Sequence, residues 1–100
     1  MKLYVLVRKD MSLSQIAVQA GHAVGEWVKS YPLAANQNWD DTLIYLGVKD
    51  EEELSDWYAR LLPFDYCIDW REEYWNNSLT SIAVLSNPIL KDLFKDLKLV

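Results

Sequence analysis

The sequence predicts an α/β protein with the order β-α-β-α-β-β-α, built on a four-stranded mixed sheet covered by helices. Short apolar runs alternate with segments whose apolar residues recur every three or four positions. Strands that are separated by a helix imply right-handed parallel crossovers. The last two apolar runs are joined by a polar loop without a helix, which predicts an antiparallel pair.

The first strand and helix are the clearest elements. Residues 3–7 are rich in Val, Leu and Tyr, which is typical of a buried strand. Ser12 or Ser14 can then cap a helix that extends to about Ser30. The predicted apolar face consists of Leu13, Ile16, Ala17, Ala20, Val24, Trp27 and Val28. At ~100° per residue, the opposite face is a polar stripe made of Gln15, Gln19, His22, Glu26 and Lys29.

The middle of the chain contains the second strand and helix. Pro32 ends the first helix, and residues 36–41 form a polar loop. Residues 42–48 form the second strand. Asp50 caps the next helix, whose first turn carries three glutamates that favour the positive end of the helix dipole. The buried stripe of that helix consists of Leu54, Trp57, Tyr58, Leu61 and Leu62.

The last third of the chain completes the sheet. Pro63 ends the second helix, and residues 64–70 and 79–85 form the third and fourth strands. Pro88 begins a final helix, whose apolar face extends to Leu97.

Composition limits the class of protein. The chain has 100 residues, of which 51% are hydrophobic and 25% charged, and this predicts one folded domain over residues 1–100. The net charge of −5 argues against DNA or long RNA as a partner, because such binding needs a basic surface. No apolar run approaches the ~20 residues that cross a bilayer, and no signal peptide is recognisable. The single cysteine, Cys67, fits a reducing compartment, so we expect a cytoplasmic protein without membrane contact.

Candidate site residues gather where strands end, because ligands of open α/β sheets bind outside the carboxyl ends of the strands. This placement brings Arg8, Asp10 and the polar stripe near Asp69 and the loop that follows it. Asp69 could act as a base or orient a water, or it could accept hydrogen bonds from loop amides. His22, the only histidine, could shuttle a proton or contact a ligand, or make one structural hydrogen bond.

Other residue types point away from metal or cofactor chemistry. One histidine and one cysteine cannot build a closed zinc site, and no phosphate-binding or dinucleotide glycine motif is present. We therefore expect neither a metal nor a cofactor. Cys67 lies in an apolar strand, which favours a role in core packing. Residues 51–53 are interpreted as a solvated helix start.

Five tryptophans are unusual in a chain of this length. Trp27 and Trp57 lie on the core stripes of their helices. Trp39, Trp70 and Trp75 fall in or beside loops, where they could stack on a nucleobase, enter a dimer interface or fold back onto the core.

Two segments near the amino terminus carry a family resemblance. Val7-Arg8-Lys9-Asp10, followed by Gln15-Ile16-Ala17-Val18-Gln19-Ala20-Gly21-His22-Ala23, resembles the first strand and helix of the type II peptidyl-tRNA hydrolases. That family reads Arg-x-Asp, then Gly-Lys-x-Ala-x-Gln-x-x-His-Ala. Residues 50–54, Asp69, residues 80–84 and Pro88 are similar to later parts of the family, so the resemblance covers nearly the whole chain.

The resemblance implies the family fold, a homodimer or higher homo-oligomer, and metal-independent cleavage of the ester between peptide and tRNA. The implied catalytic residues are Asp69, Thr80, Gln19 and His22, with Arg8 and Asp10 in support. The chain departs from the family at its Gly-Lys pair, which is Ser14-Gln15 here. It also has Glu73 in place of the threonine expected four residues after Asp69.

These departures, with the acidic balance, favour a diverged member that binds a small nucleotide-type ligand and either sequesters it or hydrolyses it slowly. A phage-type antagonist of host nucleotide signalling is one setting for such a protein, and tRNA is disfavoured as a substrate by the net charge. The expected ligand contacts are Arg8, Asp10, Gln15, Gln19, Trp70, Arg71, Glu73 and Trp75.

Two alternatives stay open. One is a functioning peptidyl-tRNA or aminoacyl-tRNA hydrolase, in which Asp69 and Thr80 orient a water and Gln15 substitutes for the lysine. The other is a non-catalytic interaction module, whose tryptophan-rich loops form a protein interface.

Overall fold

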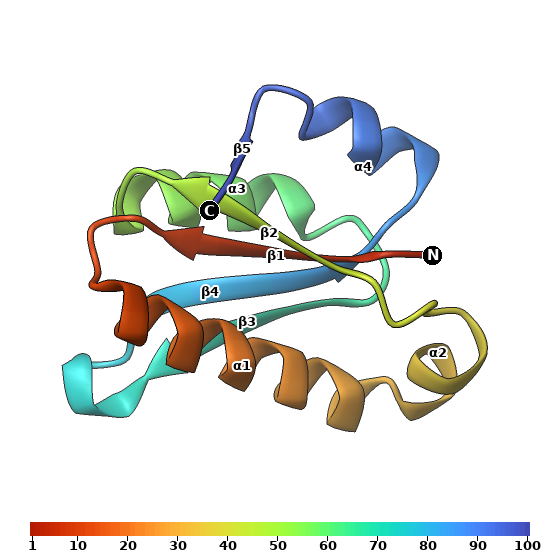
Figure 1. Cartoon of the computed structure of the whole chain (residues 1–100), viewed down its shortest axis with the longest axis horizontal. Coiled ribbons are helices and arrows are strands. Elements are labelled where there is room, and N and C mark those ends of the chain that lie inside the picture. Colours follow the sequence, from red (N-terminus) through yellow and green to blue (C-terminus); the bar gives the residue numbers. More distant parts are fainter.

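A five-stranded mixed sheet, with strand order β3-β4-β1-β2-β5, is covered by helices on both faces (Figure 1). The computed structural model describes residues 1–100. The strands are β1 (Leu3–Arg8), β2 (Leu43–Val48), β3 (Cys67–Glu72), β4 (Ser78–Leu85) and β5 (Lys98–Leu99). The helices are α1 (Leu13–Ser30), α2 (Pro32–Gln37), α3 (Glu51–Leu61), the 3₁₀ turn η1 (Glu73–Trp75) and α4 (Pro88–Leu93).

Strand pairing confirms the predicted α/β class. β1 runs parallel to β2, from Leu3 opposite Leu43 to Arg8 opposite Val48, and antiparallel to β4. β3 and β4 form the antiparallel pair that the helix-free connection predicted. Ser12 caps α1 through the backbone N–H of Gln15, and Asp50 caps α3 through that of Glu53.

The predicted number of four strands is wrong, because the C-terminal residues add β5 to the edge of β2. Two residues are too few to show a strand pattern in sequence. The close approach of this segment also depends on Gly47, where a Cβ would lie 2.6 Å from Cδ of Lys9 and 3.2 Å from Cγ2 of Val100. Gly47 therefore lets the Lys9 stem and the chain end pack over β2.

Three further boundaries differ from the expected ones. Residues 32–37 form the helix α2 instead of belonging to a turn and a polar loop. Pro32 stands at the first helical position, where a backbone N–H would have no partner within the helix, so proline costs no hydrogen bond there. α4 ends at Leu93 instead of continuing to Leu97. β3 begins at Cys67 instead of residue 64, because Tyr66 has a φ of 58° that interrupts the extended backbone.

Alternate residues of β1 enter two separate hydrophobic cores. Leu6 packs on the side of α3 and α4, whereas Val5 and Val7 pack on the side of α1 and α2. Trp57 belongs to the first core and Trp27 to the second, as the helical stripes predicted. The predicted polar stripe of α1 is not wholly exposed to solvent, because Gln19 faces β4 and is only 3% exposed.

Candidate functional site

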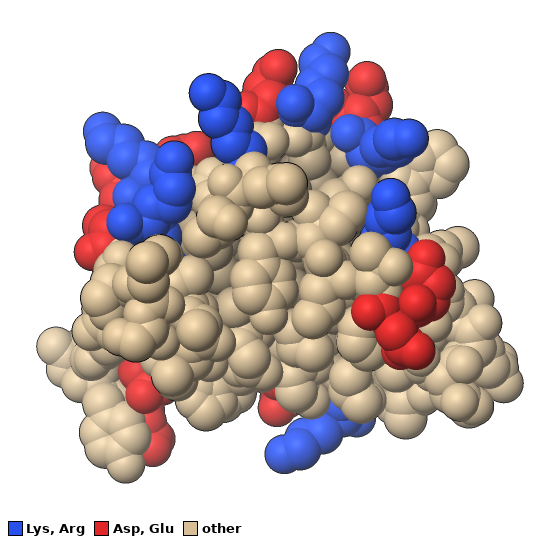
Figure 2. Space-filling model, in the orientation of Figure 1, with Lys and Arg blue, Asp and Glu red and all other residues tan.

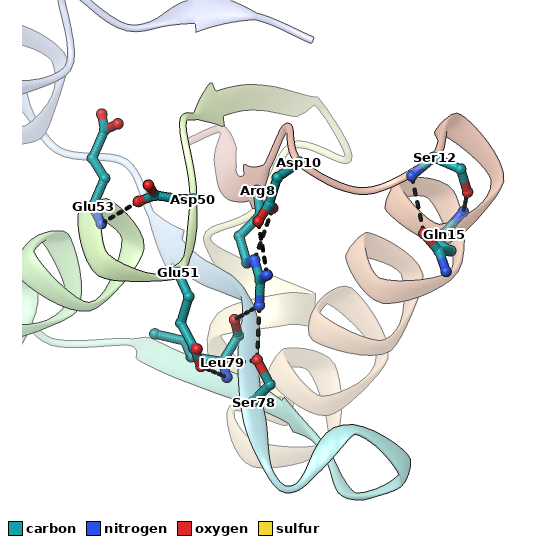
Figure 3. A network of polar contacts seen from close by, with 9 residues as sticks. All are labelled: Arg8, Asp10, Ser12, Gln15, Asp50, Glu51, Glu53, Ser78 and Leu79. Atoms are coloured by element: carbon teal, nitrogen blue, oxygen red, sulfur yellow. Dashed lines mark hydrogen bonds and ion pairs between the residues drawn. The ribbon is translucent and has the colours of Figure 1, made fainter.

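The carboxyl end of β1 holds a network of polar contacts that joins three elements (Figure 3). Arg8 donates from Nε and Nη2 to the two carboxylate oxygens of Asp10, both at 2.9 Å. Its Nη1 donates to Oγ of Ser78 at 2.7 Å and to the carbonyl of Leu79 at 3.2 Å. The hydrogen bonds between Arg8 and Asp10 raise the pKa of the guanidinium and lower the pKa of the carboxyl. The predicted pair Arg8 and Asp10 is therefore formed, and it is anchored to the start of β4.

Glu51 extends this network to the first turn of α3. One carboxylate oxygen accepts hydrogen bonds from Oγ of Ser78 at 2.9 Å and from the backbone N–H of Leu79 at 2.8 Å. The Ser78 bond, followed by the Leu79 bond, lowers the pKa of Glu51. The interpretation of residues 51–53 as only a solvated helix start is therefore wrong for Glu51, which ties α3 to β4 across a long sequence separation.

We expect the free energy of unfolding to fall as the pH drops from about 5 to 3. Glu51 and Asp10 have pKa values below their ordinary 4.5 and 3.8, so the stabilisation is present above those values. It is lost as the pH falls through the lowered pKa values of the folded state. Urea unfolding across this range should show a shallower decline for Glu51→Gln than for the wild type. The exposed neighbour Glu52 supplies the control, and a decline that is unchanged in Glu51→Gln but altered in Glu52→Gln would contradict the assignment.

The start of α1 uses Gln15 to cap the helix. Its Oε1 accepts from the backbone N–H of Ser12 at 3.0 Å, while Oγ of Ser12 accepts from the backbone N–H of Gln15 at 3.2 Å. This reciprocal pair is a capping box. The side chain at the position of the family lysine is thus engaged in local structure, and it also carries no charge.

Gln19 joins two consecutive residues of β4. Its Oε1 accepts from Oγ1 of Thr80 at 2.9 Å, and its backbone carbonyl accepts from Oγ of Ser81 at 2.9 Å. Neighbouring strand residues normally point to opposite faces, but a register irregularity opposite Trp70 and Arg71 turns both hydroxyls toward α1. Thr80 and Ser81 are fully buried, so these hydroxyls hold α1 on the sheet.

His22 lies one turn after Gln19, on the same side of α1, and stacks on Trp70. The ring centroids are 4.8 Å apart and the rings are inclined by 12°. His22 is exposed, whereas Nε1 of Trp70 is buried and has no hydrogen-bond partner. An exposed histidine on a partly buried tryptophan makes a flat aromatic surface beside the first-helix motif.

Asp69 lies on the opposite face of the sheet from Thr80. Its carboxylate accepts from Oη of Tyr58 on α3 at 3.3 Å and from Nε of Arg71 at 3.0 Å. Burial, and then the charge of Asp69, raises the pKa of Tyr58 and brings that of the Cys67 thiol to about 12. The structure therefore pairs Gln19 with Thr80 but does not place Asp69 with them, as a shared water would require.

The remaining candidates lie on the connection between β3 and β4. Glu73 is exposed in η1, Trp75 is half-buried, and Arg71 is the ion-pair partner of Asp69. The connection closes on Asn76 and Asn77, which have φ values of 53° and 58°. The residues that the sequence reasoning missed are Glu51, Tyr58, Ser78 and Ser81. Of these, only Ser78 lay in a segment that the sequence places at the site, as the end of the loop that follows Asp69.

The surface provides no long basic track on the face drawn in Figure 2. Lysines and arginines stand along its upper part with acidic residues among them, and uncharged atoms cover the centre. No helix has both the length and the apolar character that a membrane crossing requires. No three His, Cys, Asp or Glu side chains are grouped in a way that could hold a metal ion.

Comparison with known proteins identifies the family. No curated protein matches the chain significantly. Among solved structures, a protein of unknown function from Agrobacterium tumefaciens has a TM-score of 0.75 at 16% identity. The match covers 99% of this chain and 96% of the other, and it shows that the two share a fold. The family model of peptidyl-tRNA hydrolase PTH2 matches residues 1–100, which confirms the resemblance carried by the first strand and helix. The chain belongs to the PTH2 peptidyl-tRNA hydrolase family.

Proposed function

We propose that this chain is a diverged peptidyl-tRNA hydrolase-like protein that binds a small nucleotide-type ligand beside α1. The observation that carries the proposal is the stack of exposed His22 on Trp70, one turn from the motif residue Gln19. An aromatic surface can stack on a single base without the long basic track that a whole tRNA needs.

The surroundings of the stack favour binding over rapid ester cleavage. Thr80 is fully buried, Asp69 is paired with Arg71 on the other face, and Gln15 is held by its capping box. A hydrolytic site needs an accessible group that orients water and a donor for the developing oxyanion. The arrangement of these three residues supplies neither within one pocket.

Calorimetry with adenosine, its mono-, di- and triphosphates, and cyclic dinucleotides tests the binding proposal. Because one base stacked on an aromatic ring is worth ~1–3 kcal/mol, His22→Ala and Trp70→Leu should each raise Kd by ~5- to 150-fold. Lys29→Ala, an exposed change farther along α1, is the matched control. Tight binding of a cyclic dinucleotide alone would fit an antagonist of nucleotide signalling. Failure of every nucleotide to bind, or unchanged binding by His22→Ala, would overturn the proposal.

Ester hydrolysis of peptidyl- or aminoacyl-tRNA is the second candidate, and the family match over residues 1–100 favours it. Incubation with a labelled peptidyl-tRNA measures it directly, with Asp69→Asn and His22→Ala as variants. Turnover that falls sharply in both variants would support the candidate and the roles of these residues. Turnover that Asp69→Asn leaves intact would remove Asp69 from the mechanism, and an absence of wild-type turnover would exclude the candidate.

A further inference from the structure

A cavity of about 430 Å³ lies where β3 begins, at the outer edge of the sheet. Figure 1 shows this start of β3 at the end of the molecule where α1 finishes, whereas η1 and the start of α1 lie at the other end. The cavity is therefore separate from the His22–Trp70 stack. Its volume falls within the range of small-molecule sites. Four of the residues that line it are aromatic: Tyr31, Tyr58, Phe64 and Tyr66.

The tyrosine rings are held in place by hydrogen bonds that their hydroxyls make to the sheet. Oη of Tyr31 donates to the carbonyl of Cys67 at 3.2 Å, and Oη of Tyr58 donates to Asp69 at 3.3 Å. The rings of Tyr31 and Tyr66 meet at 87° with centroids 5.3 Å apart, as two walls of a box do. Because α1 contributes up to its C-cap Tyr31 and α3 contributes Tyr58, the two helical layers meet across the β3 edge here.

Tyr66, which lines this cavity, has a strained backbone conformation. Its φ of 58° is in the left-handed region, which an aromatic residue rarely adopts. Two hydrogen bonds to its carbonyl hold the conformation, from Nε1 of Trp27 at 2.9 Å and from the backbone N–H of Leu85 at 3.2 Å. Tyr66 stays 43% exposed, and its ring packs against that of Tyr31. Residues held in strained backbone conformations cluster at functional positions.

The charge at this cavity is negative. Asp65 is a lining residue, and no lysine or arginine lines the cavity. Burial, with the neighbouring Cys67 and Asp65, raises the pKa of Tyr31. Burial and Asp69 do the same to the pKa of Tyr58, so both phenols keep their protons at neutral pH. Neutral rings beside a carboxylate attract a cation through their electron-rich faces.

We propose that this aromatic cage, formed by Tyr31, Tyr58, Phe64 and Tyr66 with Asp65 at its edge, binds an organic cation of the alkylammonium class. A quaternary ammonium group loses its hydration water at a small cost in free energy. Its delocalised charge can contact several ring faces at once. A neutral apolar ligand would use the same rings but would gain nothing from Asp65. The charge of the ligand is therefore the property that the experiment has to isolate.

Choline and 3,3-dimethylbutan-1-ol have nearly the same shape, but only choline is charged. Titration of each into the full chain, followed by tyrosine ring signals in NMR, should give saturable binding of choline. The neutral alcohol should bind more weakly by about fivefold, as one cation–π contact of ~1 kcal/mol implies. Equal binding of the two compounds, or no saturable binding of choline, would overturn the proposal.

Variants then locate the site. Tyr66→Leu keeps the strained position but removes the ring, and it should weaken choline binding by roughly fivefold or more. Asp65→Asn, a change at an exposed position, should weaken choline binding but leave binding of the neutral alcohol unchanged. Tyr66→Phe should retain binding because the ring remains. Tyr74→Leu is the matched control, since Tyr74 is an 85% exposed tyrosine on η1. Choline binding that is unaffected by both Tyr66→Leu and Asp65→Asn would place the ligand elsewhere.

Discussion

Replacing Trp27 with alanine is expected to lower the free energy of unfolding by about 3–5 kcal/mol. Trp27 is fully buried in the core beside α1, where its ring meets Trp39 at 5.8 Å. The change leaves a large cavity and removes the hydrogen bond to the carbonyl of Tyr66. A domain of this size has a net stability of only ~5–15 kcal/mol, so this one side chain supplies a large fraction of it.

Urea unfolding followed by circular dichroism measures the effect of Trp27→Ala without relying on tryptophan fluorescence. Val28→Ala, the adjacent substitution at a 37% exposed side chain, is the control and should change stability by less than about 1 kcal/mol. Trp27→Phe should fall between the two, since it keeps most of the volume but loses the N–H. A loss below about 1 kcal/mol for Trp27→Ala would contradict the packing described for the α1 core.

Gln19→Ala should destabilise the fold by about 2–4 kcal/mol, even though glutamine is a polar residue on a helix. The change removes the acceptor for the buried hydroxyl of Thr80, which then keeps only the carbonyl of Trp70 at 3.3 Å. The bond from Ser81 reaches the backbone of Gln19 and survives the substitution. Thermal and urea unfolding measure the loss.

Thr80→Val tests the same contact from the other side, because valine keeps the volume but leaves Oε1 of Gln19 without its donor. The two substitutions should be less than additive when combined, since both remove one shared hydrogen bond. Lys29→Ala, at an exposed position on the same predicted stripe, should be nearly neutral. Equal effects of Gln19→Ala and Lys29→Ala would mean that Gln19 is not buried in solution.

Elements with a local signature could be predicted from the sequence. Ser12 and Asp50 stand directly before apolar periodic segments, and both cap the helices that follow them. The antiparallel pairing of β3 and β4 followed from a connection too short for a helix. β5 had no such signature, because two residues are too few to show a hydrophobic period. Their pairing with Leu46 and Gly47 depends only on the tertiary fold of the chain.

The candidate site was harder to predict because its geometry depends on exceptions to simple periods. Perfect alternation along β4 would point Thr80 and Ser81 to opposite faces, yet the irregularity in the pairing turns both toward Gln19. Asp69 follows the ordinary alternation of β3 and so faces Tyr58 on the other side. Glu51 lies in an acidic first turn that is typical of a solvated helix start. Only its contact with Ser78, which is distant in the sequence, gives it a structural role.

The left-handed backbone at Tyr66 has a consequence for comparing natural relatives and designed variants. A sequence optimised on this backbone for stability alone would place glycine or asparagine at this position, because both adopt positive φ with less strain. Such a replacement would remove the wall that faces Tyr31. Position 66 therefore distinguishes selection for stability from selection for ligand binding. Relatives selected for stability alone should carry glycine or asparagine there, and relatives selected for ligand binding should retain an aromatic residue.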